Sequence, residues 1–262
     1  MNENPVSVVL IPGFMLDESL WDELVNEMPK EWNIFRANLL QGESIAEIAQ
    51  NIAQSNAQNA PQKFIVIGFS LGGYIARSLA EQFPERVAGL ILVASSMRPD
   101  SQQQKEHKLT AIKLNSKEKF RGLSSMSILK TLHPSNANNK FLVKRIQEMG
   151  RKLGYDVFVK QSMLNRDVYD MSKIKCPTLI ISGAQDQVRS AEEATEPEAQ
   201  MEPEPGPEEN LEQEEAQEPE AAEPEAPAKG FFARLKEGLS KTTQSFTSKL
   251  DNLFKGYKTI DE

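Results

Sequence analysis

Over the first 190 residues, short apolar runs alternate with stretches in which apolar residues recur every three or four positions. The short runs predict buried strands, because each is rich in apolar residues and too brief for a helix. They cover residues 6–11, 34–40, 64–67, 87–93 and 178–181. The stretches between them predict helices, among them residues 20–28 and a segment that opens with Ser44 and Glu47 at capping-box spacing. This alternation is typical of an α/β fold with a doubly wound, mostly parallel sheet.

A long insertion separates the fourth predicted strand from the fifth. It covers about residues 97–175 and is polar to mixed in character. Its apolar spacing is helical around residues 141–149 and 158–164. An insertion of this size at one edge of a sheet predicts a helical lid.

Charge divides the chain into three parts. The net charge is −8, but residues 1–189 carry 23 basic and 19 acidic side chains, a net of +4. Residues 190–228 hold 15 glutamates and no basic residue, whereas residues 229–262 have 7 basic and 4 acidic side chains. A Glu/Pro-rich segment cannot bury enough apolar surface to offset the entropy of ordering. We therefore predict an α/β domain over 1–190, a disordered acidic linker over 191–228, and a basic amphipathic helix over 229–262.

Composition also bears on the compartment. Cys176 is the single cysteine of the chain, which excludes an internal disulfide framework and fits a reducing compartment. The first residues lack a basic region ahead of their apolar run, and no run approaches the ~20 apolar residues of a membrane span. We expect a cytoplasmic protein, with a peripheral position at the inner membrane as an alternative. No cofactor and no metal site is expected.

The clearest chemical motif is the segment VIGFSLGGYIA, in which Gly68, Ser70 and Gly72 form G-x-S-x-G between a predicted strand and a predicted helix. A sharp strand-to-helix turn lifts the serine Oγ above the sheet, and the glycines leave room for neighbouring backbone. The helix N-terminus behind Ser70 favours developing negative charge. The alternative is a glycine-rich tight turn that contains an incidental serine.

Together, the segments VVLIPGFMLDESLW, GFSLGG, PERVAGLILVASS and CPTLIISGAQD resemble the α/β-hydrolase family, of the small esterase or acyl-hydrolase type with a helical lid. The resemblance implies that Ser70 is the nucleophile and that Asp186 is the acid of a catalytic triad. It also implies an oxyanion hole made by the backbone amides of Phe14 and Leu71. The expected substrate is a small carboxylic ester. For Asp186, the alternative is a loop aspartate that caps a turn.

No histidine follows Asp186, although the family order is Ser, then Asp or Glu, then His. His107 and His133 are the two histidines of the chain, and both fall in polar surroundings within the predicted lid, where solvated side chains are expected. The resemblance implies that the last helix and strand of the family fold, which carry the histidine, are lacking. We therefore expect weak or absent turnover. Asp167 and Asp170 are predicted to be solvated at the lid edge.

The C-terminal part, about residues 195–262, resembles the acidic N-terminal region and first helix of the bacterial signal-recognition-particle receptor, most specifically in KGFFARLKEGLSKT. Its apolar stripe could insert into an anionic membrane surface, with the lysines reaching the headgroups; the alternative is a helix that packs on a partner domain. No G-x-x-x-x-G-K-[ST] motif occurs, so no nucleotide is expected, and nucleic-acid binding is not expected either. An alternative function is therefore non-catalytic targeting to a membrane or receptor. The membrane-contact candidates are Phe231, Phe232, Leu235, Lys236 and Leu239.

Overall fold

The computed structural model describes residues 5–55, 63–166, 171–183 and 186. The predictions for the linker, the amphipathic helix and the membrane-contact candidates lie outside these residues, as do those for Asp167 and Asp170. The predicted loss of a last helix and strand also concerns a part of the chain outside them. Within the described residues, no helix is both long enough and apolar enough to cross a membrane.

Five strands form one sheet in the order β2-β1-β3-β4-β5, and every neighbouring pair is parallel. The parallel α/β sheet predicted from the sequence is thus confirmed. The second strand is shorter than predicted, because it ends at Arg36 instead of continuing to residue 40. The central strands are almost wholly buried, as expected for strands covered on both faces. The strands are β1 (Ser7–Ile11), β2 (Asn33–Arg36), β3 (Phe64–Phe69), β4 (Val87–Val93) and β5 (Thr178–Ile181).

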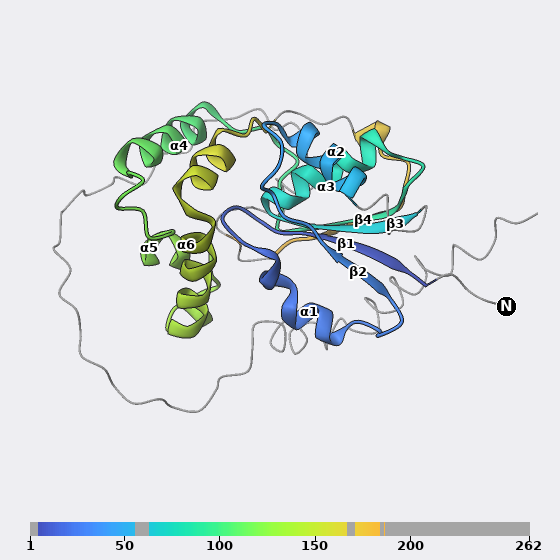
Figure 1. The fold of residues 1–262 in the computed structure, drawn as a ribbon, viewed down its shortest axis with the longest axis horizontal. Helices are drawn as coiled ribbons and strands as arrows, with labels where there is room; N and C mark the ends of the chain where they lie inside the picture. Colours follow the sequence, from blue (N-terminus) through green and yellow to red (C-terminus); the bar gives the residue numbers. More distant parts are fainter. Residues whose placement is uncertain (1–4, 56–62, 167–170, 184–185, 187–262) are drawn as a thin grey trace, which may run out of the picture. The chain divides into compact units, whose positions relative to one another are not determined.

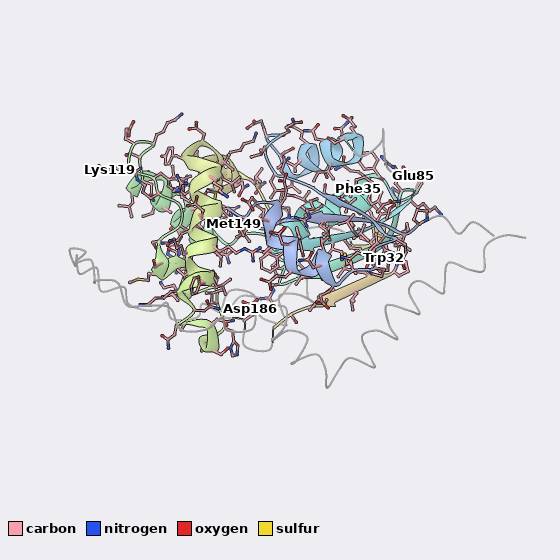
Figure 2. The ribbon with its side chains drawn as sticks, turned by 60° about the horizontal axis from the view of Figure 1, so that its bottom comes forward. Trp32, Phe35, Glu85, Lys119, Met149 and Asp186 are labelled. Atoms are coloured by element: carbon pink, nitrogen blue, oxygen red, sulfur yellow. The ribbon has the colours of Figure 1, made fainter. Side chains whose placement is uncertain are left out.

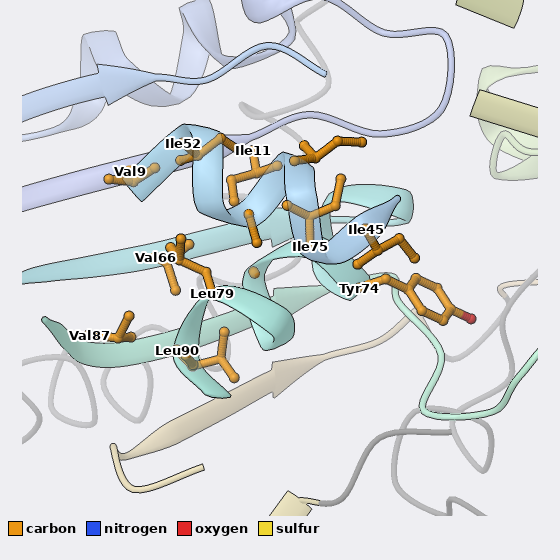
Figure 3. Packing of buried hydrophobic residues seen from close by; sticks show 14 of the residues in the cluster. Val9, Ile11, Ile45, Ile52, Val66, Tyr74, Ile75, Leu79, Val87 and Leu90 are labelled. Carbon is orange, nitrogen blue, oxygen red and sulfur yellow. The ribbon is translucent and has the colours of Figure 1, made fainter. Parts of the chain in front are cut away.

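Two helices, α2 (Ile45–Ser55) and α3 (Leu71–Gln82), cover one face of the sheet, and α1 (Asp22–Glu27) lies on the other (Figure 1). The predicted helix over 20–28 is instead a 3-10 turn, η1 (Glu18–Trp21), followed by α1. Between the sheet and the pair α2 and α3 lies the main apolar core (Figure 3). Its labelled side chains include Val9, Ile11, Val66, Ile75 and Leu79.

The start of α2 differs in detail from the predicted capping box. The hydroxyl of Ser44 accepts a hydrogen bond from the Glu47 amide at 3.1 Å, as predicted. The Glu47 carboxylate, however, accepts from the amide of Glu43, one residue before the cap, at 2.8 Å. The helix start is therefore stabilised by both side chains, with the second bond shifted by one residue.

The insertion between β4 and β5 is helical, as predicted. Its helices are α4 (Gln102–Leu114), α5 (Ser125–Leu129), η2 (Pro134–Asn136), α6 (Lys140–Met163) and η3 (Met171–Lys173). Figure 2 shows Lys119 and Met149 in this lid, at the opposite end of the molecule from Trp32 and Glu85, which precede β2 and β4. The lid helices α4, α5 and α6 therefore lie at the end of the sheet where the strands finish. Gly154, with φ 81° and ψ 175°, interrupts α6.

The two ends of the lid are clasped together beside α3. The Asp100 amide donates to the Arg166 carbonyl at 3.3 Å, and the Arg166 guanidinium lies 3.2 Å from the Asp100 carboxylate. Lys108 pairs with the other oxygen of the same carboxylate. Arg166 also lies over the ring of Tyr74, 5.4 Å from its centroid. This buried clasp attaches the lid to the helix that starts after Ser70.

Candidate active site

Ser70 lies in the sharp turn between β3 and α3, as the motif predicted. Its backbone has φ 50° and ψ −114°, a left-handed conformation that costs a non-glycine residue about 1–3 kcal/mol. The Ser70 amide is fixed by a 2.9 Å hydrogen bond to the carbonyl of Val93 on β4. The side chain is half-buried. Glycine would adopt this conformation at a lower cost in free energy. A serine at this position therefore favours a chemical role over an incidental one.

The glycines around Ser70 are required by close backbone approach. A Cβ on Gly68 would lie 2.4 Å from the Gly72 carbonyl oxygen. A Cβ on Gly72 would lie 2.3 Å from the Ile11 oxygen and 2.4 Å from the Pro12 oxygen, both at the end of β1. Since Gly72 touches the end of β1, the elbow and the loop after β1 are packed against each other. That contact places the loop containing Phe14 against the turn that carries Ser70.

Ser95, which sequence reasoning missed, lies two residues after β4 and supports the elbow from there. Its hydroxyl donates to the Ser70 carbonyl oxygen at 3.0 Å, and the Gly73 amide donates to the same oxygen at 2.9 Å. Gly73 is also packed against Ser95, because a Cβ there would lie 2.3 Å from the Ser95 Oγ. No motif marks Ser95, since its role appears only when β4 lies beside β3.

The two proposed oxyanion donors lie on the two sides of this contact. Leu71 is the first residue of α3, so its amide belongs to the unsatisfied group at a helix N-terminus. Phe14 lies in a turn closed by a 3.3 Å bond from the Leu16 amide to the Gly13 carbonyl. The next amide, that of Met15, donates to the side chain of Gln161 on α6 at 2.8 Å. The Met15 amide is thus already engaged by the lid helix.

Asp186 follows β5 and lies on the lid side of the sheet (Figure 2). Its amide donates to the Gly183 carbonyl at 3.1 Å, and its side chain is half-buried. Ser70 follows β3 in the same way. Because parallel strands finish at the same end of a sheet, both residues come to that end. The structure therefore brings Ser70 and Asp186 to one end of the sheet.

The two histidines are both exposed on the lid. His107 lies on α4. His133 caps η2, where its Nδ1 accepts from the Ser135 amide at 3.2 Å and lies 2.8 Å from the Ser135 hydroxyl. These positions match the solvated surroundings expected from the sequence. Among the described residues, no cluster of three or more His, Cys, Asp or Glu side chains could hold a metal ion.

Comparison with known proteins gives a consistent result for this part of the chain. A family model described as alpha/beta hydrolase fold matches residues 6–204. The chain is 34% identical over 93 residues to a pimeloyl-[acyl-carrier protein] methyl ester esterase of Vibrio campbellii. That match covers 34% of this chain and only 37% of the relative. It gives no support to the resemblance of about residues 195–262 to the signal-recognition-particle receptor.

Two solved structures share the fold at low sequence identity. A thermophilic esterase from Thermogutta terrifontis superposes with a TM-score of 0.62 at 22% identity, covering 73% of this chain and 76% of that one. An enol-lactonase from Burkholderia xenovorans gives a TM-score of 0.63 at 16% identity, covering 73% and 78%. At these identities the likeness concerns the fold alone.

Proposed function

The chain belongs to the alpha/beta hydrolase fold family, and from this premise we propose that it is a serine hydrolase of small carboxylic esters with impaired catalysis. The observation that carries the proposal is the strained backbone of Ser70, at φ 50° between β3 and α3. Such strain persists only where the surrounding structure enforces it, and it concentrates at functional sites. The name of the Vibrio campbellii relative supports an ester as the substrate.

In the proposed reaction, the Ser70 oxygen attacks the ester carbonyl carbon and its proton passes to a base. The carbonyl oxygen becomes an oxyanion, which accepts hydrogen bonds from the amides of Phe14 and Leu71. Collapse of this intermediate expels the alcohol with a proton and leaves an acyl group on Ser70, which water then removes. One oxyanion-hole donor contributes about 10²–10³ in turnover in such sites. Asp186 has the role of orienting the base.

The impairment follows from the lack of an assigned base. No histidine follows Asp186, and the two that precede it are exposed on the lid. Loss of a triad histidine costs on the order of 10⁶ in turnover, while the oxyanion hole and binding leave a weak residual rate. We therefore expect slow, Ser70-dependent chemistry.

A second candidate function is a non-catalytic one, which the exposure of His107 and His133 favours. In that case the hydrolase fold is retained without turnover. Residues 229–262 would then carry the function, through an anionic membrane or receptor-type targeting. This segment lies outside the described residues, so its role stays a prediction from the sequence.

Labelling of the full chain with a fluorophosphonate probe distinguishes these candidates, with Ser70→Ala as the control. The probe forms a bond from phosphorus to the serine oxygen and expels fluoride, so it reports on the nucleophile directly. Slow labelling that disappears in Ser70→Ala supports the impaired hydrolase. Labelling that persists in Ser70→Ala excludes Ser70 as the nucleophile. Rapid labelling would show that a base is present, and no labelling would favour the non-catalytic candidate.

A further inference from the structure

The long lid helix α6 is anchored to the segment between β1 and β2 at two points, one on each side of its break at Gly154. In its first half, the Arg145 guanidinium lies 3.1 Å from the Glu23 carboxylate and donates to the Ser19 carbonyl. In its second half, Gln161 accepts the hydrogen bond from the Met15 amide. Arg145 therefore joins the lid to η1 and α1, and Gln161 joins it to the loop that contains Phe14.

The Gln161 contact is buried and specific. Gln161 is 2% exposed and Met15 is fully buried, so neither the side-chain oxygen nor the amide can exchange its partner for water without a rearrangement. Polar groups in such surroundings are costly unless they are hydrogen-bonded. The 2.8 Å bond between residues 146 positions apart satisfies both groups. If the lid moved away from the loop, the Met15 amide would lose its acceptor and remain unpaired.

The bond acts on a turn that the local sequence disfavours. Residues 13–16 form a four-residue turn closed by the Leu16 amide and the Gly13 carbonyl. Met15, at its third position, has φ 53°, where turns of this kind favour glycine. Reversal of the peptide between Phe14 and Met15 would relieve the positive φ, but it would turn the Met15 N–H away from Gln161. The acceptor on α6 therefore selects the less favourable form of the turn.

The same half of α6 also contacts the Phe14 side chain. The ring centroids of Phe14 and Phe158 lie 6.0 Å apart, and those of Phe158 and Phe120 lie 5.0 Å apart. Phe158 and Phe120 form a small apolar cluster with Met15. Gln161 and Phe158 are one turn apart on the helix, so a single helix face holds both Phe14 and Met15. Displacement of this face would release both residues together.

We propose that Gln161 is a positioning residue that, by binding the Met15 amide, keeps the turn at residues 13–16 seated where the Phe14 amide reaches the oxyanion. The oxyanion hole is complete only while the second half of α6 is docked on this loop. This inference rests on the proposed function in taking Phe14 as an oxyanion donor. The contact between Gln161 and Met15 does not depend on that role.

The test compares Gln161→Leu, Gln161→Glu and Gln147→Leu in the full chain. Gln161→Leu removes the acceptor at similar size, whereas Gln161→Glu keeps one. Gln147→Leu is the matched control, because Gln147 on the same helix bonds only to Ser125 within the lid among the contacts described. Two quantities are measured in each folded variant: the exchange rate of the Met15 amide by NMR, and the fluorophosphonate labelling of Ser70 over a range of probe concentrations.

In Gln161→Leu we expect Met15 exchange to accelerate at least about tenfold, because its hydrogen bond is lost. The maximal labelling rate should fall about ten- to a hundredfold, since misplacement of a donor by about 1 Å can cost 10²-fold. The half-saturating probe concentration should not change, because binding outside the oxyanion hole is untouched. Gln161→Glu should restore both quantities, and Gln147→Leu should alter neither.

Rapid Met15 exchange in the unmodified chain would overturn the proposal, whatever the variants do. So would a folded Gln161→Leu in which exchange and labelling both match the unmodified chain. If the unmodified chain does not label at all, the proposed function fails while slow Met15 exchange still supports the anchoring of the turn by Gln161. The two failures are therefore distinguishable.

Discussion

Ser70 and Asp186, the proposed nucleophile and acid of the candidate site, are held in different ways. Ser70 follows β3, a central strand whose residues are nearly all buried, and its turn is fixed by backbone contacts on several sides. Asp186 follows β5, the last strand of the described sheet, whose residues are half-buried or exposed. Mutations should therefore be tolerated poorly around Ser70 and well around Asp186. The difference shows that two residues of one candidate site can be held differently, one by close packing and the other at a more open sheet edge.

The largest expected difference is between two glycine-to-alanine substitutions. In Gly72→Ala, the added methyl group meets the carbonyl oxygens of Ile11 and Pro12 at 2.3 and 2.4 Å, and backbone atoms cannot rotate aside. We expect a loss of about 3 kcal/mol or more in unfolding free energy, at the upper end of overpacking effects. In Gly183→Ala, the nearest atom is the Asp186 Cβ at 3.5 Å, an ordinary contact. Urea denaturation of the two variants measures the difference, and equal midpoints would contradict it.

The clasp of the lid beside α3 predicts an effect of comparable size. The Asp100 side chain is 3% exposed and pairs with Arg166, which is 9% exposed, and with Lys108. Asp100→Asn leaves these cations without their buried counter-charge, which should cost about 3–5 kcal/mol. Asp156→Asn is the matched control, because its pair with Lys117 is exposed on both sides and is screened by solvent. Thermal unfolding should show a marked decrease for Asp100→Asn and no measurable change for Asp156→Asn; similar decreases in both would contradict the assignment.

The sequence was sufficient for the parts of this structure that local pattern determines. The apolar runs predicted five strands, and the spacing of Gly68, Ser70 and Gly72 predicted the elbow. The sequence pattern did not identify α4 as a helix, because α4 has no buried residue and therefore no apolar stripe. Its start is instead fixed by a capping box between Ser101 and Gln104.

Residues that act across the fold could not be predicted from the pattern. Ser95 and Gln161 reach Ser70 and Met15 from 25 and 146 positions away in the chain. Neither carries a local signal, since nothing in the sequence around a serine after a strand or a glutamine in a helix marks it as buried. Only the pairing of β3 with β4 and the docking of α6 give them their roles. The turn at Ser70 was therefore predictable from its motif, whereas the residues that support it from elsewhere in the chain were not.

The smallest predicted effect tests how tightly the edge near Asp186 is held. Cys176, two residues before β5, is half-buried against the core, and this burial raises the pKa of its thiol above the ordinary value. Because burial disfavours the thiolate, the folded chain should be slightly less stable once pH rises above the thiol pKa of the unfolded chain. Alkylation by iodoacetamide should likewise shift to higher pH than in the urea-unfolded chain. The single cysteine makes this measurement unambiguous, and coincident pH profiles would mean that the edge opens readily.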